Sequence, residues 1–215
     1  MDDFIGIIVS QSGNQEVGKR YVGSTHVAIQ AAVDYCNSMG GGKVFIEKGM
    51  YDIQSPINLY SNIEVYGEGI GTVLKPSFAN SGDVGCLQAI GASGAELENI
   101  YIHDLLIGNT VQTLVGRYGI YCSYVGKSQT TGLTSGNNRY DSSTVGADKE
   151  NKVGARIENC HVQNNSYRGI QLTYSANNTI TGNTVQNNNN QGIRLDSSTN
   201  STITGNTVQN NGNLG

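Results

Sequence analysis

The chain is poor in charged residues and proline and contains no tryptophan. Charged side chains make up 14% of its 215 residues, and the formal net charge is −4. The sequence shows no basic stripe, which argues against nucleic acid as a partner. The longest apolar run, Phe4–Val9, is far shorter than a membrane-spanning helix needs. We therefore expect neither nucleic acid nor a membrane as a partner.

Export signals and metal-ligand motifs are also scarce. Asp2 and Asp3 stand where a secretory signal peptide carries positive charge. No CxxC pair occurs, which disfavours a zinc site, and the wide spacing of the cysteines gives no support to disulfides. No acidic cluster of the calcium-binding kind appears, so calcium is a conceivable cofactor without sequence support. We identify no metal-ligating residues and leave the cofactor open. The cysteines are expected to be four small core residues: Cys36, Cys86, Cys122 and Cys160.

The C-terminal third repeats every 23 residues. Ile157, Ile180 and Ile203 are equivalent positions, and the Val, Gln, Asn and Gly residues around them recur at the same spacing. Each unit holds three short stretches in which apolar and polar residues alternate, as β-strands do. Units this thin bury their apolar side chains only by stacking. The repeat therefore predicts an all-β parallel β-helix of about six coils, with stacked isoleucines inside and Asn183 over Asn206 at one corner.

A helix is predicted over residues 24–39, before the first strands. Ser24 can act as its N-cap, and a run of glycines, Gly40–Gly42, ends it. An apolar stripe is expected to close the open N-terminal end of the β-helix through Val27, Ala31 and Tyr35, flanked by Ala28 and Ala32.

The repeat weakens toward the N-terminus, where residues 125–152 interrupt it. This polar, unpatterned stretch reads as a surface loop inserted within one coil of a single domain, residues 1–215. Gly215 stands where the next repeat would begin. We expect either further coils in a longer repeat array or a homo-oligomeric, end-to-end contact that covers the last coil.

Two segments carry a resemblance to a known family. Residues 25–76 contain Ala28-Ile29-Gln30-Ala31-Ala32, then Gly41-Gly42, Gly49-Met50-Tyr51 and Gly67-Glu68-Gly69. This order resembles the N-terminal region of pectate-lyase-superfamily proteins, and the lower coils resemble the generic right-handed β-helix repeat. The resemblance implies a right-handed β-helix. It also implies a place among polysaccharide lyases, glycoside hydrolases, uronate epimerases, tailspike depolymerases or related non-catalytic repeats, so the substrate class is long-chain carbohydrate.

Family members that act on sugars mostly use the face formed here by the Gly-Ile-x-Leu strands. Tyrosines on that face can stack on sugar rings, and arginines can bind carboxylates. The resemblance therefore suggests an acidic polysaccharide as ligand. The candidate catalytic residues are Arg168, Arg194 and Tyr167. The candidate substrate-binding residues are Tyr118, Tyr121, Gln171, Tyr174 and Asp196. Ordinary outward residues of a β-surface remain the alternative.

Glycoside hydrolysis needs two carboxyl groups, whereas this face offers only Asp196, which can equally form an ion pair with Arg194. Hydrolysis would require Asp141 or Asp148 of the inserted loop. A lyase or epimerase needs a base and a positive charge beside the uronate carboxylate. Arg168 and Arg194 can supply the charge, while the tyrosines can move protons. Elsewhere, His103 is expected to pair with Glu158 one coil away.

Two functions stay open from the sequence. One is an extracellular protein, secreted or on a cell or virion surface, that cleaves or modifies an acidic polysaccharide by a lyase-type mechanism. The other is a non-catalytic β-helix that serves as a structural or glycan-binding part of a surface or phage tail. The irregular middle coils favour the first, and the near-identical lower coils favour the second.

Overall fold

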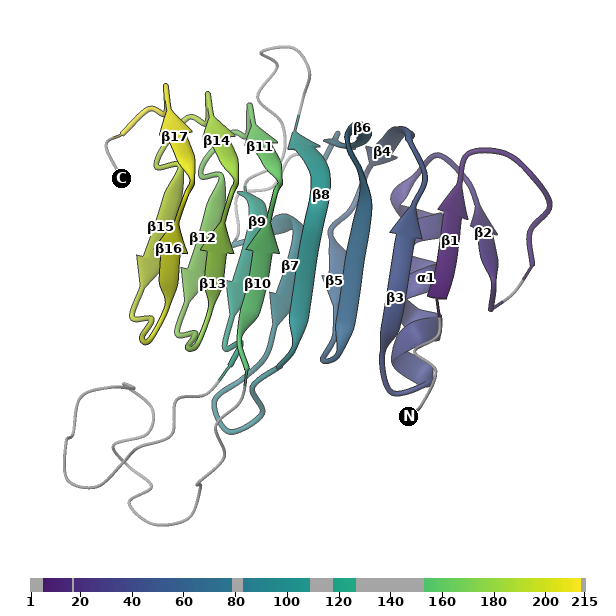
Figure 1. Cartoon of the computed structure of the whole chain (residues 1–215), viewed down its shortest axis with the longest axis horizontal. Coiled ribbons are helices and arrows are strands. Elements are labelled where there is room, and N and C mark those ends of the chain that lie inside the picture. Colours follow the sequence, from purple (N-terminus) through teal and green to yellow (C-terminus); the bar gives the residue numbers. More distant parts are fainter. Residues whose placement is uncertain (1–5, 17, 79–82, 109–117, 127–152, 214–215) are drawn as a thin grey trace.

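The computed structural model describes residues 6–16, 18–78, 83–108, 118–126 and 153–213. One helix, α1 (His26–Ser38), lies at the N-terminal end of a stack of short strands (Figure 1). In chain order the strands are β1 (Gly6–Ser10), β2 (Arg20–Val22), β3 (Gly42–Ile46), β4 (Gly49–Ile53), β5 (Ile57–Leu59), β6 (Ile63–Pro76), β7 (Gly85–Ile90), β8 (Ile100–Gly108), β9 (Tyr118–Ser123), β10 (Ala155–Glu158), β11 (His161–Gln163), β12 (Ile170–Thr173), β13 (Thr179–Thr181), β14 (Thr184–Gln186), β15 (Ile193–Asp196), β16 (Thr202–Thr204) and β17 (Thr207–Gln209).

The strands form two sheets around one core. Sheet A follows the order β16-β13-β10-β8-β6-β3-β1-β2, with β4, β11, β14 and β17 attached to it, and sheet B follows β15-β12-β9-β7-β5. Neighbouring strands within both sheets are parallel, because each strand pairs with its equivalent in the next coil. The chain is therefore a right-handed parallel β-helix, and the predicted fold class is confirmed.

Stacked isoleucines fill the interior as the 23-residue spacing predicts. Ile157 pairs in register with Ile180, and Ile180 pairs with Ile203. The first two are fully buried, whereas Ile203 is 48% exposed. The register is thus confirmed for all three, but the predicted burial of Ile203 is wrong, since no described coil lies beyond β16 to cover it.

The four cysteines are unpaired and buried. Burial raises the pKa of the Cys122 and Cys160 thiols to about 12. A thiol that stays protonated in this way behaves as a small apolar group. The prediction that the cysteines are core residues is confirmed.

The two sheets approach closely where each strand of the Gly-Ile-x-Leu type begins. A Cβ built on Gly169 would lie 2.4 Å from Cγ1 of Val185, and the same clash recurs at the equivalent glycines of the coils before and after. Only glycine leaves room for the valine of the facing sheet. The repeated glycine is therefore a packing requirement that sets the distance between the sheets.

Asparagine side chains hold one corner of successive coils together. Asn183 accepts a hydrogen bond from the backbone N–H of Cys160 at 2.9 Å and donates to the carbonyl of Ile157 and to Oδ1 of Asn206, each also at 2.9 Å. Asn183 is only 1% exposed, so these bonds satisfy backbone groups that water does not reach. The stacked corner amides predicted for Asn183 and Asn206 are confirmed.

Two further ladders were not predicted. Asn188 donates to the carbonyl of Val162 at 3.2 Å and to Oδ1 of Asn211 at 3.0 Å. On the outer surface, Gln186 donates to Gln163 at 3.0 Å, and the glutamine of the following coil donates to Gln186 at 2.8 Å. Neighbouring coils are thus joined by side chains at several points around their circumference.

Helix α1 closes the N-terminal end, but with a different face from the one predicted. The buried side chains are Ala28, Ile29, Ala32, Val33 and Cys36, while Val27 is 63% exposed. Ala31 and Tyr35 are only partly buried against the core. The predicted stripe is therefore confirmed at Ala28 and Ala32 but wrong at its centre, because Ile29 and Val33 turn toward the core in place of Val27, Ala31 and Tyr35. The N-cap is Thr25 rather than Ser24, and no side-chain cap bond forms.

The same helix also covers a free sheet edge. Strand β5 is the last strand of sheet B, so its outer backbone groups lack a neighbouring strand. Gln30 of α1 accepts a hydrogen bond from the Asn58 N–H at 2.7 Å and donates to the Asn58 carbonyl at 3.1 Å. Its side-chain amide thereby takes the place of the missing peptide group. The helix caps both the apolar interior and one strand edge.

The predicted inserted loop, residues 125–152, lies outside the described residues except at Val125 and Gly126. The candidate carboxylates Asp141 and Asp148 lie outside them as well.

Replacement of the corner asparagine tests the ladder. We expect Asn183→Ala to lower the free energy of unfolding by about 2–3 kcal/mol, because a buried N–H and a buried carbonyl lose their partners. Denaturant unfolding measures the change. Thr204→Ala, at an exposed position of the same sheet, is the control, with an expected change within about 0.5 kcal/mol. Equal losses in both variants would contradict a specific role for the corner amide.

The edge cap has a direct readout in hydrogen exchange. We expect Gln30→Ala to speed exchange of the Asn58 amide and to lower stability by about 1 kcal/mol, since one bond to each backbone group is lost. Asn37→Ala, at an exposed position of the same helix, should leave that amide unchanged. An Asn58 amide equally protected in both variants would show that Gln30 does not cap the edge.

Candidate functional site

Three of the candidate ligand contacts lie in one row across sheet B. Tyr121 on β9 pairs in register with Gln171 on β12, and Gln171 pairs with Arg194 on β15. Two residues further along, Thr173 pairs with Asp196. Alternation directs all five side chains away from the apolar core. The structure therefore brings these residues onto one face, at the spacing of successive coils.

The row differs in accessibility from one end to the other. Tyr118, Tyr121 and Gln171 are 2%, 7% and 3% exposed, so they lie beneath the surface of this face. The side chains of Arg194 and Asp196 are 39% and 50% exposed. Alternation predicts only the direction of a side chain, not its accessible area. A ligand that approaches this face therefore meets the coils of β12 and β15 rather than β9.

Arg168 is the most firmly held cation on this face. It stands in the turn before β12, with its guanidinium carbon 4.2 Å from the ring centre of Tyr167. Its Nε donates to Oε1 of Gln191 at 2.6 Å, and its Nη2 donates to the Tyr167 hydroxyl at 3.0 Å. Both side chains are half-buried. The two candidate catalytic residues Arg168 and Tyr167 are thus in direct contact.

The tyrosines predicted to bind sugar instead pack on one another. The Tyr118 ring lies 5.1 Å from Tyr121 at an interplanar angle of 23°, and 5.6 Å from Tyr167 at 53°. The Tyr118 hydroxyl donates to Oδ1 of Asp83 at 2.6 Å. Burial is the main cause that raises the pKa of Tyr121 above its usual value. Tyr118 and Tyr121 therefore support Tyr167 from below.

The buried Gln171 amide is half satisfied. Its Nε2 donates to Oγ1 of Thr173 at 2.8 Å, but its buried Oε1 has no hydrogen-bond partner among the residues that the structure describes. Because an unpartnered buried acceptor is costly, this oxygen is a point where a water or a ligand hydroxyl would be stabilised.

Three candidates remain: Arg194 and Asp196 on β15, and Tyr174 directly after β12. Arg194 and Asp196 form the ion pair that the sequence left open, with Nη2 and Oδ2 3.5 Å apart. Tyr174 packs on Tyr124 at 5.3 Å between ring centres. An exposed pair at this distance is weak and easily exchanged for a ligand carboxylate.

Two residues of this face were missed from the sequence. Gln191 stands 23 positions after Arg168, so the repeat spacing alone places it one coil further at the same corner. Asp83, which holds Tyr118, obeys no such spacing. The first residue could have been found by subtraction, whereas nothing in the sequence marks the second.

A second polar cluster lies on sheet A around His103 and Glu158. Its contacts show that the predicted pairing of His103 with Glu158 is wrong. His103 and Glu158 are neighbours in register, but they do not pair. His103 instead contacts Glu64 through Nε2 at 3.2 Å and Asp104 through Nδ1 at 2.7 Å. Glu158 is occupied by the Tyr101 hydroxyl at 2.7 Å, together with an arginine on its own strand. Partners nearer than His103 therefore take up the Glu158 carboxylate.

The charges of this cluster are balanced within it. Burial alone would raise the pKa of Glu158, but hydrogen bonds from Tyr101 and Arg156 hold it below the usual range. Burial, together with the hydrogen bond to Glu158, raises the pKa of Tyr101 to about 12. The cluster therefore keeps a charged carboxylate and a neutral phenol at neutral pH.

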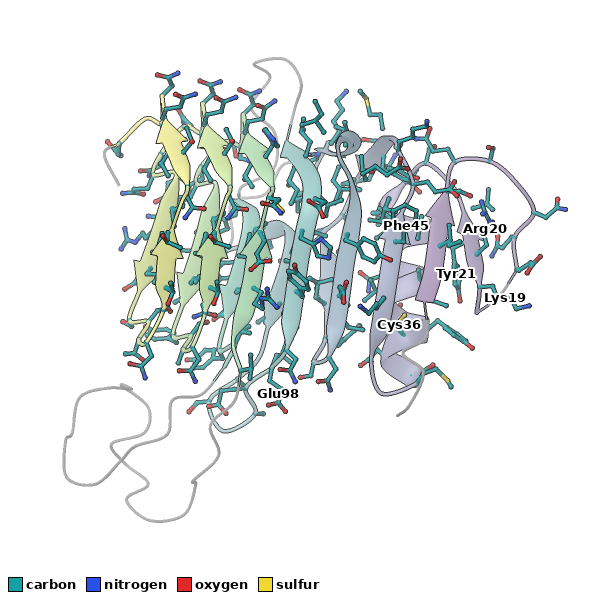
Figure 2. All side chains as sticks on the ribbon, in the orientation of Figure 1. Lys19, Arg20, Tyr21, Cys36, Phe45 and Glu98 are labelled. Carbon is teal, nitrogen blue, oxygen red and sulfur yellow. The ribbon has the colours of Figure 1, made fainter. Side chains whose placement is uncertain are left out.

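The rings of the same cluster form a column along the coils. Phe45, which Figure 2 shows on β3, lies 5.1 Å from Tyr66, and Tyr66 stacks on His103 at 5.0 Å. Their faces are turned toward each other and so are closed to a sugar ring. We therefore assign this column to the packing of sheet A and place the candidate site on sheet B.

The fold is shared with solved structures of bacterial and viral proteins. The A-module of mannuronan C-5 epimerase AlgE4 from Azotobacter vinelandii is 19% identical, with a TM-score of 0.59 over 88% of this chain and 55% of that one. The AlgE6 A-module from the same organism is 20% identical, with a TM-score of 0.53 over 84% and 52% of the two chains. ORF18 of Geobacillus virus E2 is 17% identical, with a TM-score of 0.52 over 87% and 38%.

At these identities the likeness establishes the fold alone. The chain spans about half the length of the epimerase modules that it matches. No curated protein sequence matches it.

Residues 87–215 match the family described as periplasmic copper-binding protein (NosD). The residues of this segment do not fit a copper centre. It contains two histidines, two cysteines and no methionine, and both of its cysteines, Cys122 and Cys160, are buried with a raised thiol pKa. Among the described residues, no three His, Cys, Asp or Glu side chains are grouped so as to hold a metal ion.

The matched segment includes β8 to β17, and thus the repeats on which the fold and the candidate site depend. It covers 129 of the 215 residues (215 − 87 + 1), which is more than half of the chain. The chain therefore belongs to the NosD family.

Proposed function

We propose that this protein binds an acidic polysaccharide on the outer face of sheet B. The contact surface is the cationic edge, which we define as Tyr167, Arg168 and Arg194. The observation that carries the proposal is the state of Arg168, whose guanidinium lies against Tyr167 and is bonded at Nε and Nη2, yet has no carboxylate partner among the described residues. A guanidinium oriented in this way can receive a carboxylate in a bidentate manner.

The scaffold suits a long polymer. Successive coils repeat at about 4.8 Å along the helix axis, so side chains on one face form a straight, rigid row. Arg168 lies in the turn before β12 and Arg194 lies on β15, so the two stand on neighbouring coils of the same face. Two cations on a rigid support can hold carboxylates on one chain without ordering a mobile loop. The names of two structural relatives, both mannuronan C-5 epimerases, agree with such a ligand.

The chemistry that we propose for the edge is of the lyase type. A base must take the proton beside the uronate carboxylate while a positive charge stabilises the carbanion that forms. The carbanion then forms a carbon–carbon double bond as the bond to the glycosidic oxygen breaks, and that oxygen takes up a proton. Tyr167 is the proposed proton acceptor, since its hydroxyl oxygen lies beside the proposed carboxylate partner, from which it accepts a hydrogen bond at 3.0 Å. Arg168 and Arg194 are the proposed partners of the carboxylate. Tyr118, Tyr121, Gln171, Tyr174 and Asp196 would support or extend the binding surface.

The second candidate is a non-catalytic, glycan-binding or structural β-helix. The hydrogen-bonded ladders through Asn183 and Asn188 favour it, because they make the lower coils uniform and stiff. Such uniformity suits a rod-like part of a surface or a phage tail. Both candidates share the same binding edge and differ in whether a bond is broken there.

A location outside the cytoplasm follows from either function. The family to which the chain belongs is described as periplasmic, and polysaccharide ligands are found in the envelope or beyond it. No helix in the described part of the chain is long and apolar enough to cross a membrane. An end-to-end contact between copies remains our proposal for the oligomeric state.

Removal of either arginine tests the binding edge. We expect Arg168→Ala and Arg194→Ala each to weaken binding of an oligouronate by about 1–3 kcal/mol, because a charge-assisted contact is lost. Isothermal titration calorimetry at fixed salt measures the affinity. The control is Arg20→Ala, which changes net charge equally but lies on β2, at the far end of the molecule from β15 (Figure 2). Unchanged affinity in both edge variants would remove the basis of the proposal.

A separate assay distinguishes the two candidates. Uronate-containing polymers incubated with the protein should develop the ultraviolet absorbance of an unsaturated uronate if a lyase acts. Tyr167→Phe should then abolish that absorbance but only weaken binding, because the ring and both arginines remain while one hydrogen bond to Arg168 is lost. If the unmodified protein binds the polymer without any new absorbance, the proposed elimination is wrong.

A further inference from the structure

We infer that Gln191 is a positioning residue that holds the Arg168 guanidinium in the plane needed to receive a carboxylate, and so makes the cationic edge selective for acidic over neutral sugars. The inference rests on the proposed function and adds to it the determinant of charge selectivity.

The guanidinium of Arg168 is fixed from three sides. Nε is bonded to Gln191 at 2.6 Å, Nη2 is bonded to the Tyr167 hydroxyl at 3.0 Å, and the guanidinium carbon lies 4.2 Å from the Tyr167 ring centre. Of the five N–H donors of an arginine, these bonds use two. Both hydrogens of Nη1 and one of Nη2 remain, and they form the outer edge of the guanidinium, which matches the two oxygens of a carboxylate.

Gln191 comes from the next coil, and its own backbone is held firmly in place. Its carbonyl accepts the N–H of Gly169 at 3.2 Å, and its N–H is bonded to Oδ1 of Asn190 at 3.0 Å. The Asn190 N–H is in turn bonded to the carbonyl of Tyr167 at 2.7 Å. The side chain that orients Arg168 is thus anchored on the two residues that flank Arg168. The guanidinium is placed before any ligand arrives, which lowers the entropic cost of binding.

The residue type at this position decides the charge of the edge. A carboxylate at position 191 would orient Arg168 equally well, but it would neutralise the guanidinium. The glutamine amide accepts the same hydrogen bond without a negative charge. A neutral acceptor at Arg168 leaves its charge available, in contrast to Arg156 and Arg194, which face Glu158 and Asp196 within 3.5 Å. This difference singles out Arg168 as the cation kept for a ligand.

The experiment separates orientation from charge. Affinities for an oligouronate, and for the neutral oligosaccharide made by reducing its carboxyl groups, are measured for the unmodified chain, Arg168→Ala, Gln191→Ala and Gln191→Glu. We expect Gln191→Ala to weaken oligouronate binding about three- to tenfold, because the guanidinium loses its fixed plane but keeps its charge. Gln191→Glu should weaken it further, and binding of the neutral sugar should stay unchanged in both.

Gln209→Ala is the matched control, since it removes an exposed glutamine that also bonds to a neighbouring coil, but on sheet A. Melting temperatures of all variants confirm that they fold. If Arg168→Ala binds the oligouronate like the unmodified chain, Arg168 does not bind the carboxylate, and the proposed function loses the observation on which it rests. If Arg168→Ala is weakened but both Gln191 variants are not, the positioning role is wrong while the binding edge survives. Equal loss of acidic and neutral sugar binding in Gln191→Ala would also overturn it, since that is the effect of a merely structural residue.

Discussion

The stacking of each residue on its equivalent 23 positions away is the constraint on which this molecule depends. A single coil has strands of three or four residues in its lower part, and these cannot bury their apolar side chains alone. In the stack, Ile157 rests on Ile180, and the Asn183 amide bonds the backbone of the coil before it. The apolar contacts supply the drive toward burial, whereas the amides remove the cost of burying corner backbone groups. Neither the apolar contacts nor the corner amides alone would stabilise the stack.

The same constraint produces the candidate site. Because register is exact from coil to coil, outward side chains on sheet B line up without any loop to place them, and Gln171 meets Arg194 one coil away. The hydrogen bond between Arg168 and Gln191 also joins equivalent positions of neighbouring coils, but it links a cation to a neutral amide rather than two amides. A scaffold made for stability thus also fixes the geometry of a binding surface. Stability and binding make different demands only where a side chain must keep hydrogen-bonding groups free for a ligand.

The sequence places residues most closely where the repeat is regular, and less closely elsewhere. The period of 23 predicts the stacked isoleucines, the corner amides and the shared face of Gln171 and Arg194, and the recurring Gly-Ile pattern adds Tyr121 to that face. It carries no information on how deeply a side chain is buried, which is why Tyr121 was expected at the surface. The helix face was misjudged because an alanine-rich helix offers several apolar stripes, and only packing against the first coils selects Ile29 and Val33.

Contacts between coils that do not follow the 23-residue repeat could not be predicted from the sequence. His103 pairs in register with Tyr66, so its contact with Glu64 runs diagonally between β8 and β6, and the register alone does not predict it. The bond from Tyr118 to Asp83 likewise spans an irregular interval. These contacts arise from the packing of particular side chains, and they emerge only in three dimensions.

The central claim, that an acidic glycan binds at the cationic edge, is tested most directly by mapping the ligand on the molecule. An isotope-labelled chain titrated with an oligouronate should show backbone and arginine Nε chemical-shift changes grouped at Tyr167, Arg168, Gln191 and Arg194, with saturation at a single affinity. Changes grouped instead around His103 and Tyr66 on sheet A, or no saturable change at any residue, would contradict the account.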